Sequence, residues 1–290
     1  MANETWRIVL ITTVAPVADA LAGALRAIGH EPVAVMSARR RQPGAASPYA
    51  ITDASVPAGL DVLIPRDRHS IEPLMRGLHP DLAICSGYPW RIPLAALEVP
   101  RYGSINSHPA FLPRHRGPIP ISWAIREGDA SYGVTWHRMD ADLDTGAILS
   151  QTSVPARDDE FDWPTLGPRL LQAELDSLPE ALTRLAAGDP GEPQAAEGAS
   201  WAGHFGRDYA EIDWAKPAGE IQRQVRAWAF AAGTEQVPGP IATLDGQRVK
   251  ITRTSLVDPR EAEGAIRIEA GDGPIWVVAW EPLEEPAASS

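Results

Sequence analysis

The segment SINSHPAFLPRHRG, residues 104–117, combines an asparagine and a histidine two positions apart with two prolines and a closing glycine. The amide of Asn106 and the imidazole of His108 could form half of an active site. They could also be ordinary polar residues of a turn, because both residue types are common there. Pro109 and Pro113 restrict the chain after the pair, which favours side chains held in fixed positions.

A second polar segment, MDADLDTG at 139–146, contains three aspartates within five positions, followed by Thr-Gly. It could form an Asx-rich hairpin turn, supply a carboxylate that orients a histidine, or bind a divalent metal. A calcium loop needs glycine at its sixth position and glutamate at its twelfth. Counted from Asp140, those positions hold Thr145 and Gln151, so we expect no metal.

Several common catalytic motifs are absent from the sequence. There is no G-x-S-x-G and no G-x-x-x-x-G-K-[ST], and the first turn between a strand and a helix, TTVAPVAD, lacks the glycines of a dinucleotide site. These absences argue against a serine hydrolase, an NTPase and a dehydrogenase. We expect structural or surface roles for the other histidines: His30, His69, His79, His115, His137 and His204.

The elements around these segments follow an alternating pattern. Short apolar runs predict strands at 7–11, 33–36, 61–64, 81–85 and 102–106, with helices predicted between them at 17–28 and 71–78. This order is typical of an α/β fold with a doubly wound, mostly parallel sheet. Ligands bind beyond the carboxyl ends of such strands. We therefore expect the binding site among the loops that begin at Thr12, Ser37, Ser86 and Asn106.

The rest of the chain is predicted to complete this domain and to form a second one. A helix at 120–128, strands at 132–140 and 147–154, and a helix at 164–186 follow the site segments. We expect a catalytic domain over 1–188, a linker over 189–205 rich in Gly, Pro and Ala, and a small β-barrel domain, OB-like, over 206–284. Residues 285–290 are expected to be a tail.

Composition limits the partners and the compartment. The chain has 290 residues, 26 Lys or Arg against 38 Asp or Glu, and a net charge of −12. A long polyanion is therefore disfavoured as a partner, although a local patch such as Arg39–Arg41 could act against the net charge. The apolar run at 7–11 is too short for a signal peptide or membrane span, and Cys85 is the only cysteine, so we expect a cytoplasmic protein without membrane contact.

NSHPAFLPRHRG and MDADLDTG together resemble the two site loops of the folate-dependent formyltransferases, whose loops occur in this order after a similar β-α frame. The resemblance continues in EIDWAKPAGEIQRQVRAW, DGQRVKI and GAIRIEAGDGPIWV, which are similar to the C-terminal domain of the methionyl-tRNA formyltransferases. It covers about Arg7 to Pro282. It implies an enzyme that moves the formyl group of N10-formyltetrahydrofolate to an amine, with no metal.

The resemblance also implies roles for individual residues. The family's catalytic Asn, His and Asp fall on Asn106, His108 and Asp144. Formyl transfer to an amine passes through a tetrahedral species with a developing oxyanion, which requires a hydrogen-bond donor and a proton carrier. Asn106 would donate to the oxyanion, His108 would carry the proton, and Asp144 would fix the histidine tautomer and raise its pKa.

The same resemblance places the pteridine between loop 86–92 and loop 140–144, bound largely by backbone groups. The candidate residues are Trp90, Ile92, Ala141 and Asp142.

The acceptor is predicted from charge and from two departures from the tRNA enzymes. The first turn lacks their Gly-Thr-Pro, their basic loop is reduced to Arg39–Arg41, and residues 201–290 hold nine Lys or Arg against 14 Asp or Glu. We therefore expect a small or carrier-bound amine acceptor, such as an amino sugar or a specialised metabolite. Methionyl-tRNA is the alternative, and a formyltetrahydrofolate hydrolase or a non-catalytic folate-binding module is a second one.

Overall fold

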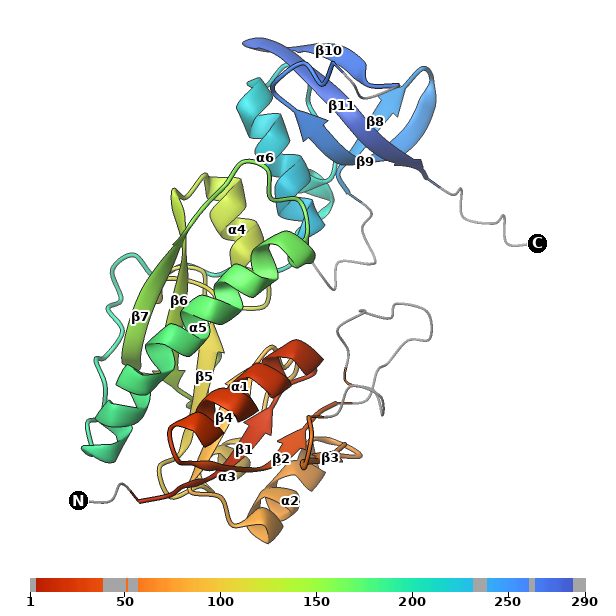
Figure 1. Cartoon of the computed structure of the whole chain (residues 1–290). Coiled ribbons are helices and arrows are strands. Elements are labelled where there is room, and N and C mark those ends of the chain that lie inside the picture. The colour runs from red at the N-terminus through yellow and green to blue at the C-terminus, as the bar shows by residue number, and fades with distance from the viewer. Residues whose placement is uncertain (1–3, 39–50, 52–56, 232–238, 261–263, 284–290) are drawn as a thin grey trace. The chain divides into compact units, whose positions relative to one another are not determined.

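A computed structural model of the chain describes residues 4–38, 51, 57–231, 239–260 and 264–283 (Figure 1). It divides into two compact units that are interleaved along the sequence. The first consists of Met1–Arg116, Gly133–Val154 and Pro168–Ser200, and the second of Gly117–Tyr132, Pro155–Gly167 and Trp201–Ser290. The basic run at Arg39–Arg41 and the expected tail at 285–290 lie outside the described residues.

The first unit is built on a seven-stranded sheet with the order β3-β2-β1-β4-β5-β6-β7. The first five strands in the chain pair in parallel, and β6 runs antiparallel to β5. The strands are β1 (Arg7–Ile11), β2 (Glu31–Met36), β3 (Asp61–Leu63), β4 (Leu82–Ser86), β5 (Ser104–His108), β6 (Ser131–Arg138) and β7 (Ile148–Pro155). The expected mostly parallel sheet is confirmed.

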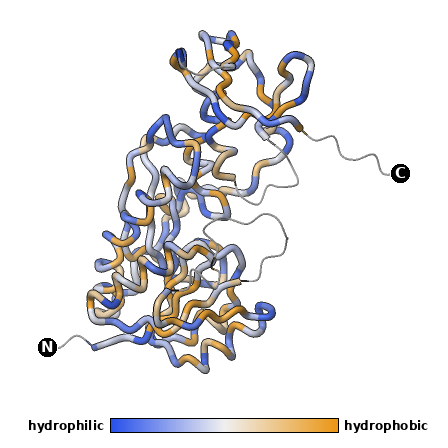
Figure 2. Tube along the Cα trace, turned by 45° about the vertical axis from the view of Figure 1, so that its right-hand side comes forward, coloured by the Kyte–Doolittle hydropathy of each residue, from blue (hydrophilic) through white to orange (hydrophobic). Residues whose placement is uncertain are grey.

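Helices cover both faces of this sheet. Buried leucines of α1 (Ala15–Ala27) and α5 (Trp163–Ala186) pack with Ile84, Ile105 and Trp136 on one face. Residues of α2 (Ile71–Leu78) and α3 (Leu94–Leu97) pack on the other face. Figure 2 shows hydrophobic stretches gathered in the interior of the part of the trace that carries the N-terminus. Burial of these side chains is the main source of the unit's stability.

The second unit contains α4 (Pro120–Glu127), α6 (Ala218–Ala229) and a four-stranded antiparallel sheet of order β10-β11-β9-β8. The strands are β8 (Ile241–Leu244), β9 (Gln247–Ser255), β10 (Ile266–Ala270) and β11 (Gly273–Pro282). Ile221 and Val225 of α6 pack against the inner side of this curled sheet. The expected small barrel is present as this half-barrel.

One strand differs from its prediction in a way that matters for the site. The apolar run predicts a strand at 102–106, whereas β5 covers Ser104–His108. Asn106 and His108 therefore lie within the strand, at its carboxyl end, and not in a loop beyond it.

Among the described residues, no helix is both long and apolar enough to cross a membrane.

Candidate active site

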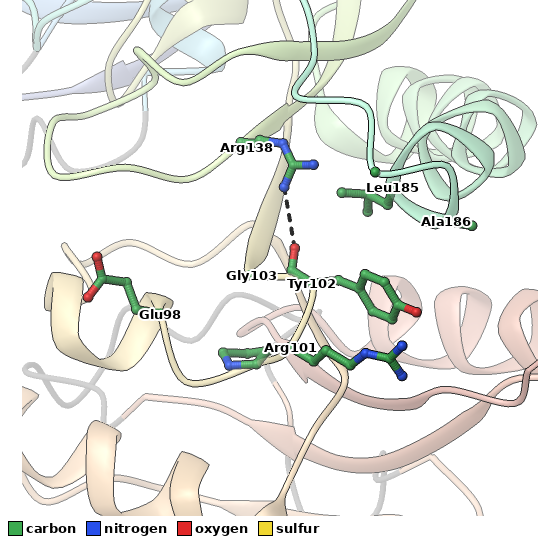
Figure 3. Close-up of a pocket in the computed structure, with 9 residues that line it drawn as sticks. Glu98, Arg101, Tyr102, Gly103, Arg138, Leu185 and Ala186 are labelled. Carbon is green, nitrogen blue, oxygen red and sulfur yellow. Dashed lines mark hydrogen bonds between the residues drawn. The ribbon is translucent and has the colours of Figure 1, made fainter.

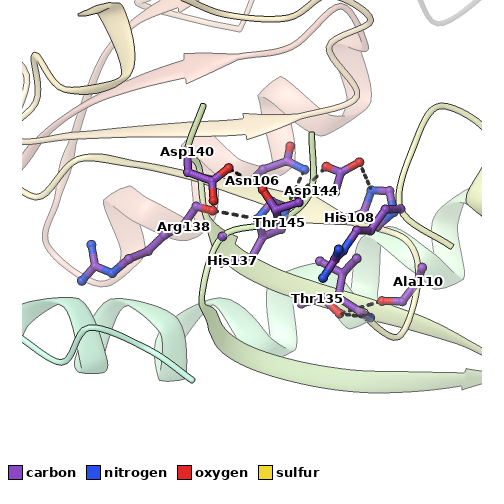
Figure 4. A network of polar contacts seen from close by, with 12 residues as sticks. Asn106, His108, Ala110, Thr135, His137, Arg138, Asp140, Asp144 and Thr145 are labelled. Atoms are coloured by element: carbon purple, nitrogen blue, oxygen red, sulfur yellow. Dashed lines mark hydrogen bonds and ion pairs between the residues drawn. The ribbon is translucent and has the colours of Figure 1, made fainter. Parts of the chain in front are cut away.

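Asn106 and His108 lie on one face of β5 because successive side chains of a strand point to opposite faces. Ile105, the residue before Asn106, packs into the core formed with α1 and α5. The side chains of Asn106 and His108 therefore face the other side of the sheet. Both residues are at the carboxyl end of a parallel strand, where this type of sheet binds its ligands. Figure 4 shows the polar network that surrounds them.

The ring of His108 is held by a backbone group. It is 5% exposed, and its Nε2 lies 2.8 Å from the carbonyl oxygen of His115. A carbonyl oxygen only accepts hydrogen bonds, so Nε2 carries the proton and donates it. In the neutral ring, Nδ1 then has a free lone pair, and this nitrogen lies 3.7 Å from Asp144 Oδ2. Nδ1 is therefore the atom that can accept a proton.

Burial lowers the pKa of His108, and this effect is larger than the opposing one of the Asp144 carboxylate, which raises it. The hydrogen bond to the His115 carbonyl also raises the pKa, while His137 and His115 lower it further. The histidine is consequently neutral at neutral pH. The expected influence of Asp144 on the pKa is present, but the His115 carbonyl is what fixes the tautomer.

The three aspartates of MDADLDTG have different surroundings. Asp140 Oδ1 accepts hydrogen bonds from the Asp142 amide at 3.1 Å and from Thr145 Oγ1 at 2.7 Å, which makes an Asx-type turn. The Asp142 side chain is 80% exposed and lies 3.5 Å from Arg91 Nη2. Asp144 has a left-handed backbone with φ of 58° and carries the carboxylate that reaches the histidines. The hypothesis of an Asx-rich turn thus fits Asp140, and the hypothesis of a carboxylate beside a histidine fits Asp144.

His137 is the residue that sequence reasoning missed. It lies on β6 directly opposite Asn106, and its Nε2 is 3.2 Å from Asn106 Nδ2 and 3.6 Å from Asp144 Oδ1. Its Nδ1 donates to the Arg138 carbonyl at 2.8 Å, so its Nε2 accepts one N–H of the Asn106 amide. The alternation in 132–140 places His137 on one face, but the register that pairs it with Asn106 is not visible in the sequence.

Two glycines let the site segments lie close to β6. A Cβ on Gly133 would be 2.2 Å from the Phe111 amide nitrogen, and one on Gly146 would be 1.9 Å from the Arg138 carbonyl oxygen. Such contacts are impossible, so only glycine fits. Loop 109–113 is further fixed by Thr135, whose hydroxyl donates to the Ala110 carbonyl at 2.6 Å.

The four residues expected at the pteridine are divided between surface and core. Trp90 is 36% exposed with its ring edge-on to Tyr88, while Ile92 is buried with the side chains beneath α2 and α3. The Ala141 carbonyl accepts a hydrogen bond from Arg91, which also pairs with Asp142. Arg91, which the sequence did not single out, therefore ties loop 86–92 to loop 140–144. The folate-binding assignment of these residues stays a prediction.

A cavity of about 570 Å³ lies at the other end of β5 (Figure 3). Tyr102, Gly103 and Arg138 line it together with the end of α5. The Arg138 guanidinium donates there to the carbonyls of Asp189 at 2.7 Å and Pro190 at 2.9 Å. None of the predicted site residues lines this cavity, and Arg138 connects it to the polar network, because the Arg138 carbonyl accepts from His137 Nδ1.

Comparison with family models decides the family. The formyl transferase model matches residues 3–182, and the model of the formyl transferase C-terminal domain matches residues 207–282. The chain belongs to the folate-dependent formyltransferase family. The resemblance inferred from the two site segments is thereby confirmed.

Two curated relatives are named methionyl-tRNA formyltransferase. The chain is 38% identical over 202 residues to the methionyl-tRNA formyltransferase of Pseudomonas fluorescens (strain Pf0-1), covering 69% of this chain and 60% of the relative. It is 35% identical over 268 residues to that of Paracoccus denitrificans, covering 88% and 86%. The matched part thus spans about three fifths of the first relative's length and most of the second's.

Solved structures with lower sequence identity show the same fold. HypX from Aquifex aeolicus in complex with tetrahydrofolic acid has a TM-score of 0.67 at 19% identity, covering 97% of this chain and 45% of that one. WlaRD, a sugar 3N-formyl transferase, has a TM-score of 0.64 at 17% identity, covering 98% and 100%.

The expected small or carrier-bound amine acceptor is wrong. The relatives at 35–38% identity are methionyl-tRNA formyltransferases, whereas the sugar formyltransferases among the structural neighbours are 17–20% identical. The physical error lies in the use of net charge. A count over residues 201–290 averages acidic and basic positions and does not describe the local surface, and local arrangement is what binds phosphate groups.

Proposed function

We propose that this chain transfers the formyl group of N10-formyltetrahydrofolate to the amine of methionyl-tRNA. The observation that carries the proposal is the convergence of Asn106, His108 and Asp144 at the carboxyl end of β5 in a member of this family. The acceptor rests on the relatives at 35–38% identity, which are named for it.

Asn106 has the hydrogen-bonding capacity that an oxyanion requires. One N–H of its amide donates to His137 Nε2, so the amide plane is oriented and its second N–H remains to be aimed at a ligand. When the amine nitrogen attacks the formyl carbon, the formyl oxygen gains negative charge. A donor already held in position stabilises that charge without reorganising at the moment of reaction.

His108 provides the proton route. Nδ1 takes the proton that the attacking amine loses, and Asp144 stabilises the imidazolium that results. The same nitrogen then returns the proton to N10 as the bond between the formyl carbon and N10 breaks. One N–H bond is lost from the acceptor and one is formed on the folate, so the histidine ends in its starting state.

The surfaces near the network suit a flat heteroaromatic donor. Trp90 and Leu143 are exposed hydrophobic side chains, one on each of the two loops that Arg91 connects. An exposed aromatic ring can stack on the face of a pteridine. Asp144 ends the 140–144 loop and lies 3.7 Å from His108, so a donor bound at these loops would present its formyl group near His108.

The test is formylation of charged initiator tRNA by the purified protein with N10-formyltetrahydrofolate, followed by mass spectrometry of the released amino acid. We expect formylmethionine, and losses of about 10²-fold or more in kcat for Asn106→Ala and His108→Ala. The exposed His69→Ala serves as the matched control and should keep wild-type rates. Formate release without tRNA and no formylmethionine would instead indicate a hydrolase and refute the proposed acceptor.

A further inference from the structure

The segment 190–200, called the strap below, makes hydrogen bonds to both site segments although its composition is that of a linker. At one end, Glu192 exchanges two backbone hydrogen bonds of 2.8 Å with Ile148. At the other end, the Ser200 amide donates to the Pro113 carbonyl at 3.2 Å, and Ser200 Oγ accepts from the His115 amide at 2.8 Å. The strap is therefore part of the unit that contains the site.

Gln194 lies in the middle of the strap, and its side chain links the two segments. Its Nε2 donates to the carbonyls of Asp144 and Gly146, both at 2.8 Å. Its Oε1 accepts from Arg116 Nε at 2.9 Å and Nη2 at 2.7 Å. Both N–H groups and both lone pairs of the amide are used, so only one orientation of the side chain satisfies all four bonds.

Two of the three partners of Gln194, Asp144 and Arg116, are connected to the His108 ring. Asp144 has a left-handed backbone, which is unfavourable for a residue other than glycine and must be held by its surroundings. A hydrogen bond to the Asp144 carbonyl restricts the backbone of this residue and therefore the position from which its carboxylate extends. Arg116 directly follows His115, whose carbonyl accepts the His108 Nε2 proton.

We propose that Gln194 is a positioning residue for formyl transfer, which holds the Asp144 carboxylate at His108 by tying the 139–146 segment to the end of the 104–117 segment. The proposal deepens the proposed function and rests on it. Gln194 contacts no reacting atom, so its effect is carried through Asp144. The charged or titratable groups that act on the His108 ring are Asp144, His137 and His115.

Gln194→Glu distinguishes the hydrogen bonds that Gln194 accepts from Arg116 from those that it donates to the 139–146 segment. A carboxylate still accepts from Arg116, but it has no N–H for the carbonyls of Asp144 and Gly146. Gln194→Ala removes both halves. The matched control is Glu192→Ala in the same strap, because that side chain is 75% exposed and, within the part of the chain that the structure describes, pairs with Arg184.

We expect kcat to fall about 10-fold to 100-fold in both Gln194 variants, with KM for the formyl donor and the tRNA within about 2-fold of wild type. In Gln194→Ala, which introduces no charge, NMR titration of the His108 ring should show a lower pKa than in the wild-type protein, because the Asp144 charge that raises this pKa has moved away. Glu192→Ala should keep the wild-type kcat and titration.

A Gln194→Ala protein with wild-type kcat and an unchanged His108 titration would overturn the inference. So would a lower kcat with an unchanged titration, because a purely structural weakening does not move the histidine pKa. The NMR measurement needs no acceptor. If the wild-type protein does not formylate tRNA, the proposed function fails while the titration still tests whether Gln194 positions Asp144.

Discussion

Asp144 Oδ2 lies 3.7 Å from His108 Nδ1, beyond hydrogen-bonding distance but close enough for strong electrostatic interaction. The tautomer of the ring is set elsewhere, by the bond from Nε2 to a backbone carbonyl. The carboxylate therefore acts on the charged form of the histidine and leaves the neutral form with an accessible lone pair. The tautomer and the pKa of His108 therefore depend on different groups, and their effects can be tested separately.

The pH dependence of formyl transfer should follow the neutral form of His108. Burial lowers its pKa from the ordinary value of 6.5, so kcat/KM should stay constant from pH 7 downward past 6.5 and decline only below that. Asp144→Asn removes the charge that raises the pKa, so the acid limb should move to still lower pH while the plateau rate falls. Steady-state rates between pH 5 and 8 test this, and an acid limb that moves upward in the variant would contradict it.

Asn106 and His137 should behave as one unit. Because His137 Nε2 accepts an N–H of the Asn106 amide, His137→Ala leaves that amide free to rotate. We expect a loss of about 10-fold in kcat for His137→Ala, about 10²-fold for Asn106→Ala, and for the double variant a loss close to that of Asn106→Ala alone. Rate losses that multiply would show that the two side chains act independently.

Glu174 of α5 should make stability depend on pH. It is 7% exposed, accepts a hydrogen bond from Ser86 Oγ at 3.2 Å, and has a pKa raised to about 7 by burial. The unfolded carboxyl has the ordinary pKa of 4.5, so the folded state binds the extra proton and loses stability as the pH rises from 4.5 to 7.

Glu174→Gln should remove this loss, because the neutral amide oxygen still accepts from Ser86. We expect a gain in the free energy of unfolding of about 3 kcal/mol above pH 7 and almost none at pH 4.5. Denaturant unfolding at several pH values measures it. Glu180→Gln, on an exposed turn of the same helix, is the control and should change stability by less than about 0.5 kcal/mol.

The close approach of Gly146 to β6 should make it intolerant of any side chain. A Cβ there would overlap the Arg138 carbonyl, so Gly146→Ala must displace the segment that carries Asp144 and should lower the unfolding free energy by about 2 kcal/mol or more. Gly23→Ala, an exposed helix position with open space around it, should instead stabilise by about 0.5–1 kcal/mol. Thermal unfolding of the two variants distinguishes these effects.

Much of the fold could be predicted because its elements are marked locally. The periodicity around Ile71–Leu78 predicts α2 to the residue, and the apolar run predicts β1. β5 is displaced by two residues because an apolar run marks only residues buried among other apolar groups. The strand continues through Asn106 and His108, whose polar side chains face the site.

The rest of the site depends on contacts between distant parts of the chain. His137 reaches Asn106 through strand register, and Gln194 reaches Asp144 across 50 residues. Neither relationship leaves a local pattern. The sequence therefore predicts only a structural or surface role for His137, and it places Gln194 in a linker. The acceptor was wrong for a related reason, since net charge contains no information on position.

The bonds made by the strap also determine what can be exchanged as a module. A chain cut after α5 would retain every residue of the Asn-His-Asp set and lose the amide that holds its aspartate. Recombination with a related C-terminal region should therefore preserve turnover only when the crossover lies after Ser200. The part of the chain that must stay with the site therefore includes the eleven residues 190–200, although their composition is that of a linker.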